Sequence, residues 1–149
     1  MTLAEKQVEI TTRLAALKNG QDRLALLVAQ AKKIPPRPPE FRADENLIPG
    51  CLARLWFTAQ FRDGLCFFDC DSDSLVVKAI AGLLCDFYSG HASAEIMAHD
   101  PGFLAPLGIT QHLTPNRRNA LAKVWERIRQ FAERHLETSN IQHRTSNTQ

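Results

Sequence analysis

Four cysteines carry most of the reactive chemistry in this sequence, and they stand at positions 51, 66, 70 and 85. A cysteine thiolate can act as a nucleophile or as a metal ligand, so spacing and setting decide between the two roles. Structural zinc sites usually contain Cys-x-x-Cys pairs, and this sequence has none. We therefore expect no structural zinc ion.

Three of the cysteines have the surroundings of buried, inert thiols. Cys66 and Cys70 fall on the same face of an expected strand as Phe68, and Cys85 flanks the apolar face of an expected helix. Free cysteine is among the residue types most often buried, where it packs as a small hydrophobic side chain.

Cys51 has a different setting, because it follows Pro49 and Gly50 in the segment "NLIPGCLARLWF" (residues 46–57). Proline and glycine place it on a loop, and glycine also lets another molecule approach the backbone closely. These residues alone leave two interpretations open: a reactive thiol that meets a partner, or a small side chain tucked under a turn.

The acidic stretch "FFDCDSDSL" (residues 67–75) suggests an enzyme, since a strand that ends in Asp-x-Asp is similar to the nucleophile strand of haloacid-dehalogenase-type phosphatases. That site needs a parallel sheet and a later acidic strand end, which we do not find in the sequence. An EF-hand loop is excluded because Val76 stands where the loop needs glycine. We interpret the stretch as a helix cap with a carboxylate patch, in which Asp73 is exposed enough to contact a partner.

The composition is that of an ordinary globular domain. The chain has 149 residues, of which 44% are hydrophobic and 23% are charged, and its net charge is +2. So small a charge does not indicate a nucleic-acid partner. No run approaches the ~18 apolar residues of a membrane span, and the N-terminal segment has no apolar signal-peptide core. We expect a cytoplasmic protein with reduced thiols and neither a nucleic-acid nor a membrane partner.

Helical periodicity predicts two helices near the N-terminus, over residues 4–18 and 21–33. Val8 and Leu14 belong to the apolar stripe of the first helix. The proline-rich segment 34–41 then predicts an extended connection, because proline cannot continue a helix.

Two strands are expected next, over residues 53–62 and 65–70, because apolar and polar residues alternate there. The segment "RDG" (residues 62–64) is typical of a tight hairpin turn, so the strands are expected to be antiparallel. Trp56 falls on the face opposite the apolar one, and we expect it to pack rather than to contact a partner. Residues 46–49 offer a short third strand.

Three helices complete the expected fold. A central helix follows residues 71–74, and a short helix has Ser93 as its cap. The last helix has Thr114 as its cap and Pro115 at its first helical position. We expect residues 138–149 to form a disordered tail.

The order of these elements predicts an α+β fold, in which a small antiparallel sheet of two or three strands packs against helices. The length fits one domain, and we place it at residues 1–137.

Three segments resemble the SufE family of iron–sulfur assembly proteins, in the same order and at similar spacing. The segment "IPGCLARLWF" (residues 48–57) resembles the family's active-site loop and first strand, and "DSDSLVVKAIAGLL" (residues 71–84) resembles the start of its central helix. The segment "LGITQHLTPNRRNAL" (residues 107–121) contains the family's "TQHLTP" signature and the arginine that follows it, here Arg117. The resemblance covers roughly residues 5–135 and implies a fold similar to the IscU scaffold.

SufE-type proteins accept sulfane sulfur from a pyridoxal-phosphate-dependent cysteine desulfurase, stimulate its turnover, and pass the sulfur to iron–sulfur cluster assembly. The resemblance implies that this chain is a carrier and activator rather than an enzyme, with Cys51 as the persulfide carrier. Its implied partners are a desulfurase of the SufS or CsdA type and a downstream iron–sulfur scaffold. It implies no bound cofactor, because the pyridoxal phosphate belongs to the desulfurase.

The resemblance also gives supporting or partner-binding roles to Gly50, Asp73, His112 and Arg117. We expect Arg117 to supply positive charge that lowers the pKa of the Cys51 thiol, and His112 to add a hydrogen bond. We also expect the loop to hold Cys51 inward at rest and to swing it out for the partner.

Three alternatives stay open at this point. One is a scaffold that binds iron or a cluster directly, which needs several thiolates at one open site. Another is a carrier of the CsdE type, which serves a different desulfurase and pathway. The third is a sulfur relay through Cys66 or Cys70, which we favour least because both are expected to be buried.

Overall fold

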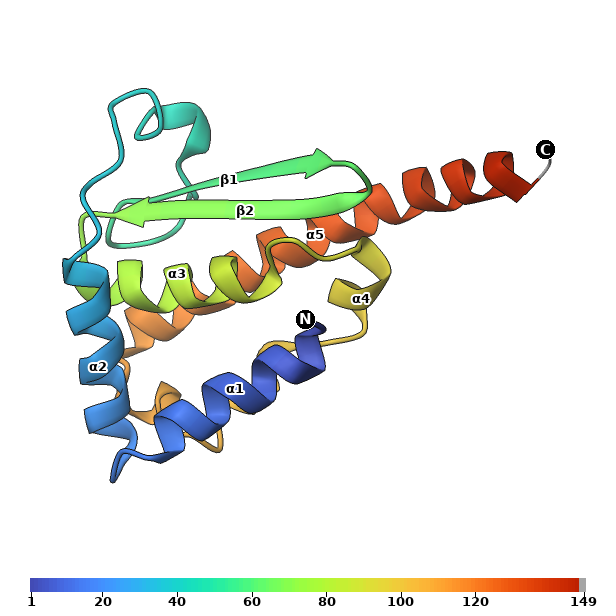
Figure 1. The fold of residues 1–149 in the computed structure, drawn as a ribbon. Helices are drawn as coiled ribbons and strands as arrows, with labels where there is room; N and C mark the ends of the chain where they lie inside the picture. Colours follow the sequence, from blue (N-terminus) through green and yellow to red (C-terminus); the bar gives the residue numbers. More distant parts are fainter. Residues whose placement is uncertain (148–149) are drawn as a thin grey trace.

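The computed structural model describes the backbone of residues 1–147 and the side chains of residues 1–136. Within that part the chain forms a two-stranded antiparallel sheet and five α-helices. Helices α3 (Leu75–Tyr88) and α5 (Pro115–Asn147) lie under one face of the sheet (Figure 1). Helices α1 (Leu3–Ala15) and α2 (Gly20–Lys32) pack on the side of α3 away from the sheet. The α+β fold expected from the sequence is confirmed.

Capping side chains fix where the two N-terminal helices begin, α1 (Leu3–Ala15) and α2 (Gly20–Lys32). The Thr2 hydroxyl accepts a hydrogen bond from the Glu5 N–H at 3.1 Å, and the Glu5 carboxylate accepts one from the Thr2 N–H at 3.0 Å. This reciprocal pair satisfies two amide groups that the first helical turn leaves without partners. Asn19 caps α2 through its side-chain oxygen.

The buried face of α1 differs from the expected apolar stripe. Leu3 and Leu14 are fully buried, whereas Val8 is 65% exposed. The face of α1 that packs on the core therefore runs through Leu3, Ile10 and Leu14, and Val8 was wrong as a guide to that face.

The hairpin joins β1 (Leu55–Arg62) to β2 (Leu65–Ser72) in antiparallel register. Its two turn residues, Asp63 and Gly64, have φ values of 54° and 79°. Positive φ at both central residues is the geometry that matches the twist of a two-residue hairpin. The expected turn is therefore confirmed, although β2 continues past residue 70 to Ser72.

The short third strand expected at residues 46–49 is reduced to a single antiparallel bridge between Leu47 and Trp56. Trp56 is buried beneath this connection, and the Arg42 guanidinium lies 4.7 Å from the centre of its ring. Trp56 is thus a packing residue, on a sheet face that the alternation alone marked as polar.

Helix α3 (Leu75–Tyr88) is the centre of the fold. The Ser74 hydroxyl caps it by accepting a hydrogen bond from the Val77 N–H at 3.3 Å. Its buried residues pack against the sheet and the neighbouring helices, and they are Val77, Ala79, Ile80, Ala81, Leu84, Cys85, Phe87 and Tyr88.

The remaining helices are α4 (Ser93–Met97) and α5 (Pro115–Asn147). Ser93 does not cap α4 as expected, because it is the first helical residue and its buried hydroxyl lies 3.4 Å from the Cys66 sulfur. Thr114 caps α5 by accepting a hydrogen bond from the Arg117 N–H at 3.3 Å.

The tail expected to be disordered, residues 138–149, stays a prediction. The backbone of α5 continues as a helix to Asn147, the side chains of that stretch lie outside the described part, and so do residues 148 and 149 altogether.

The carboxylate of Asp71 is fully buried at the end of β2, so it is not part of an exposed acidic patch. It accepts hydrogen bonds from the Arg37 N–H at 2.8 Å and from the Arg42 guanidinium at 2.9 Å, and the Lys78 ammonium lies 3.7 Å away. A buried carboxylate is tolerated only when its charge is paired and hydrogen-bonded. Asp71 therefore ties the proline-rich connection to the sheet.

Replacing Asp71 with asparagine should lower the free energy of unfolding by about 2–4 kcal/mol, because the ion pair is lost and a buried donor loses its acceptor. Urea unfolding near neutral pH, followed by circular dichroism, measures this. In the matched control Asp69→Asn, the carboxylate is 39% exposed and pairs with Arg37. That change should cost less than about 1 kcal/mol. Equal losses of unfolding free energy in the two variants would contradict the role of Asp71 in tying the connection to the sheet.

The same unfolding measurements at lower pH test the sign of the effect. Burial alone would raise the pKa of Asp71, but the hydrogen bonds from Arg37, Arg42 and Ser72 outweigh it and hold that pKa below its usual value. The unfolded chain then binds the proton more readily than the folded chain. The stabilisation is complete above about pH 5 and is lost as pH falls below about 4. The Asp71→Asn variant should lose less stability than the parent over that range.

Candidate functional site

Cys51 lines a cleft of about 500 Å³ that opens between the loop before β1 and the first turns of α3 and α5. Its side chain is half-buried, packed at the edge of the hydrophobic core. Asp73 and Arg117, two of the residues predicted to support it, line the same cleft. Segments far apart in the sequence thus meet around one thiol.

The turn before Cys51 depends on Gly50, whose φ is +83°. Residues with a β-carbon rarely adopt this conformation. A β-carbon placed there would also lie 3.2 Å from Cε and 3.3 Å from Nζ of Lys123 on α5. The Gly50 carbonyl accepts a hydrogen bond from the Asn119 side-chain amide at 3.2 Å. Glycine at this position therefore allows both the turn and its close contact with α5.

Asp73 holds the other end of the loop. Its carboxylate accepts a hydrogen bond from the Arg54 N–H at 3.1 Å, and its own N–H donates to the Arg54 carbonyl at 3.3 Å. The Ser72 hydroxyl donates to the same carbonyl at 2.6 Å. Asp73 is exposed, as the sequence predicted, and it also shapes the loop that carries Cys51.

The electrostatics of the thiol differ from the expectation. Burial raises the pKa of Cys51, and the positive charge of Lys123 offsets only part of that rise. Arg117 lines the cleft, but the cation that acts on the pKa of Cys51 is Lys123. In this conformation Cys51 is therefore mostly a protonated thiol near neutral pH.

His112 lies in a 3-10 turn, Thr110–His112, where its side chain is exposed. It is not among the residues that line the cleft, and within the described side chains it makes no hydrogen bond to Cys51. The role expected for it toward the thiol is unsupported by this geometry, and a role in partner binding stays a prediction.

The sequence reasoning missed Asn119 and Lys123, which stand one turn apart on α5. Residues four apart on a helix share a face, so the sequence alone indicates that these two polar side chains lie on the same side of α5. Nothing local indicated that this side faces the turn at Gly50, because the contact depends on how α5 packs.

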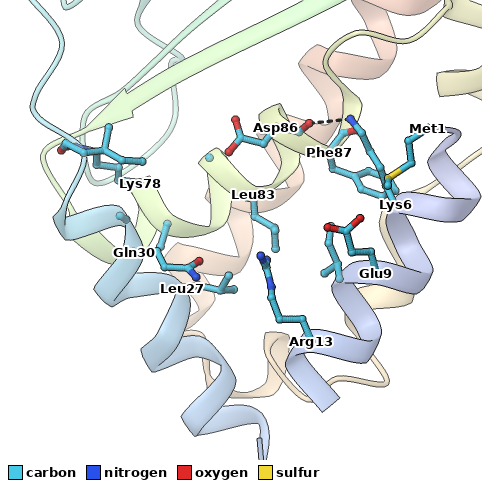
Figure 2. Close-up of a pocket in the computed structure, with 15 residues that line it drawn as sticks. Met1, Lys6, Glu9, Arg13, Leu27, Gln30, Lys78, Leu83, Asp86 and Phe87 are labelled. Atoms are coloured by element: carbon cyan, nitrogen blue, oxygen red, sulfur yellow. Dashed lines mark hydrogen bonds between the residues drawn. The ribbon is translucent and has the colours of Figure 1, made fainter. Parts of the chain in front are cut away.

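A second cavity, of about 480 Å³, lies between α1, α2 and α3 (Figure 2). Leu27, Leu83 and Phe87 form its apolar wall, and the Lys6 ammonium donates hydrogen bonds to the carbonyl groups of Asp86 and Phe87 at 3.2 and 3.0 Å. No cysteine is among the described residues that line it. The accessible thiol chemistry therefore belongs to the first cleft.

Two further searches concern only the described part of the chain. No group of three or more His, Cys, Asp and Glu side chains is placed there to hold a metal ion. None of the helices there combines the length and the apolar character that crossing a membrane requires.

The fold and the cleft define a small α+β protein that presents one half-buried thiol between a loop and two helix starts. The chain belongs to the SufE family, because the family model described as "SufE: Fe-S metabolism associated domain" matches residues 8–132. Membership implies a role in sulfur transfer for iron–sulfur metabolism.

Similar proteins come from plants and bacteria. The chain is 30% identical over 136 residues to "SufE-like protein 1, chloroplastic/mitochondrial" of Arabidopsis thaliana, and the match spans 91% of this chain but 36% of that relative. It is 26% identical over 130 residues to "Cysteine desulfuration protein SufE" of Wigglesworthia glossinidia brevipalpis, covering 85% of this chain and 90% of the relative.

A similar solved structure is the solution structure of a hypothetical protein from Thermus thermophilus. The two agree with a TM-score of 0.69 over 89% of this chain and 96% of the other, at 23% identity. This likeness supports the fold.

Iodoacetamide should label one of the four cysteines in the folded protein, Cys51, because the other three are at most 8% exposed. The rate should keep rising into the alkaline range, since burial raises the pKa of Cys51 and only the thiolate reacts. Intact mass and peptide mapping measure both results. The Cys51→Ser variant should stay unlabelled until urea is added, and labelling of Cys66 or Cys70 before unfolding would contradict the assignment.

Proposed function

We propose that this protein accepts sulfane sulfur on Cys51 from a pyridoxal-phosphate-dependent cysteine desulfurase of the SufS or CsdA type, in the cytoplasm. It stimulates turnover of that enzyme and passes the sulfur to an iron–sulfur scaffold. The observation that carries this proposal is the half-buried Cys51 thiol in a cleft, within a chain of the SufE family. The relative named as a cysteine desulfuration protein supports the same type of partner.

The transfer is a thiol exchange at the outer sulfur of the donor. The Cys51 thiolate attacks the outer sulfur of the desulfurase persulfide, so a new S–S bond forms while the donor's S–S bond breaks. The donor cysteine leaves as a thiolate and takes up a proton, and Cys51 becomes the persulfide. Electrons balance between the two cysteines, so the step needs no external oxidant or reductant.

The cleft suits a persulfide because part of its lining is apolar, through Leu52, Val77 and Ala120. A persulfide is easily lost to dissolved reductants, and half-burial limits their access to it. Arg117 and the exposed edge of Asp73 offer charged contacts to the desulfurase, at the mouth of the same cleft. Such rim charges guide association more than they add affinity.

The raised pKa of Cys51 fits a thiol that rests inward and reacts after it has moved. Leu52, the next residue, is 83% exposed, so the tip of the loop already points an apolar side chain toward solvent. We propose that the desulfurase binds this tip and draws Cys51 outward.

Hydrogen exchange tests this movement. Amides of residues 46–53 should exchange faster when a catalytically inactive desulfurase is added. When the loop leaves the cleft, the Gly50 carbonyl loses the hydrogen bond from Asn119, and the Ile48 N–H is then expected to lose its own hydrogen bond to the Leu55 carbonyl. Amides of the β1–β2 hairpin serve as the internal control and should not change. Unchanged exchange across the loop, with complex formation verified, would contradict an outward movement.

A cluster-binding scaffold is the alternative from a different class. It needs several thiolates at one open site, whereas Cys66, Cys70 and Cys85 lie in the core between the sheet and the helices. This placement favours the carrier, and it also disfavours a relay through Cys66 or Cys70. A carrier of the CsdE type would use the same cleft, so the identity of the desulfurase that transfers sulfur fastest separates the two branches.

Incubation with a cysteine desulfurase and free cysteine should add one sulfur atom, about 32 Da, to the intact protein as a persulfide. The Cys51→Ser variant should gain no mass, and a Cys66→Ser control should behave like the parent. Dithiothreitol should remove the added mass. Persistence of the gain in Cys51→Ser would overturn the site, and a brown, visibly absorbing protein after iron and sulfide are supplied would favour the scaffold.

A further inference from the structure

We propose that Lys123 is a positioning residue that sets the reactivity of Cys51 while the loop rests against α5: its ammonium group lies close to Gly50 and supplies the counter-charge when the Cys51 thiolate forms there. This inference deepens the proposed function and rests on it. Lys123 lies on α5 (Pro115–Asn147), two residues beyond the last of the three segments that resemble the SufE family.

The geometry comes from two side chains on one face of α5. Asn119 donates a hydrogen bond to the Gly50 carbonyl at 3.2 Å, and Lys123 follows it by one helical turn. A β-carbon on Gly50 would lie 3.3 Å from Nζ of Lys123, so the ammonium group lies close to the turn that holds the thiol. Asn119 fixes the backbone of the turn, and Lys123 brings a full positive charge beside it.

Three charged groups lie around the Cys51 loop: Arg117 and Asp73 line the cleft, and Lys123 lies close to Gly50 without being a lining residue. The Asp73 carboxylate already accepts a hydrogen bond from the Arg54 N–H. Lys123 is the cation whose charge lowers the pKa of Cys51, against the larger effect of burial. Among the described side chains, Lys123 forms no ion pair that would neutralise it.

A charge at this place changes the amount of reactive thiolate. Because the pKa of Cys51 stays raised, thiolate is the minor form near neutral pH, and its amount falls tenfold for each unit that the pKa rises. The site is partly open to solvent, which screens the interaction. Removing the charge should therefore lower the thiolate fraction about three- to tenfold. The rate falls somewhat less than the thiolate fraction, because a thiolate of higher pKa is the stronger nucleophile.

The experiment compares Lys123→Met with Lys123→Arg, which keeps the charge, and with Arg118→Met. Arg118 is an exposed cation of the same helix that, unlike Lys123, does not act on the pKa of Cys51, and it does not line the cleft, so its loss removes one charge without touching the site. The rate of Cys51 alkylation by iodoacetamide is measured against pH on each isolated protein, with circular dichroism to verify folding. Sulfur uptake from a cysteine desulfurase is then measured in a single turnover.

Lys123→Met should shift the alkylation profile to higher pH and slow alkylation near neutral pH about three- to tenfold. Lys123→Arg and Arg118→Met should stay close to the parent. Equal profiles for Lys123→Met and Arg118→Met would overturn the role of Lys123, whatever the protein does with sulfur. If the parent accepts no sulfur from any desulfurase, the proposed function fails, and the alkylation profiles still decide whether Lys123 controls the thiol.

Discussion

The buried carboxylate of Asp71 fixes the course of the connection between α2 and β1, and the cleft depends on that course. The connection is tied down where Arg37 and Arg42 donate hydrogen bonds to this carboxylate. Between these ties and the start of β1 at Leu55, the chain turns at Gly50, whose φ is +83°. That turn places Cys51 between the first residues of α3 and α5.

The loop itself is held by weaker ties on either side of Cys51. Asn119 holds the Gly50 carbonyl, and Asp73 holds the amide of Arg54, at 3.2 and 3.1 Å. Hydrogen bonds of this kind contribute about 1 kcal/mol each when water can replace them. A firm tether at Asp71 followed by light ties near the thiol gives a loop that rests in one place but moves at little energetic cost. This contrast matches the outward movement proposed for the loop.

The sequence predicted the features that short segments determine by themselves. The hairpin turn at Asp63 and Gly64 follows from the conformational freedom of two adjacent residues, and the loop position of Cys51 follows from proline and glycine before it. Asp71 was predicted as part of a helix cap. Its burial between two arginines was not predicted, because no local pattern shows that these distant residues will surround it. Lys123 was missed for the same reason, since its meeting with residue 50 exists only after α5 has packed beside the loop.

One wall of the cleft consists of residues 114–120, at the start of the last helix. During synthesis, that wall does not exist until this segment has left the ribosome, and the loop has nothing to pack against before then. The nascent chain therefore passes through an interval in which the Cys51 thiol is fully open to oxidants, and a strongly reducing environment matters most for the newly made protein.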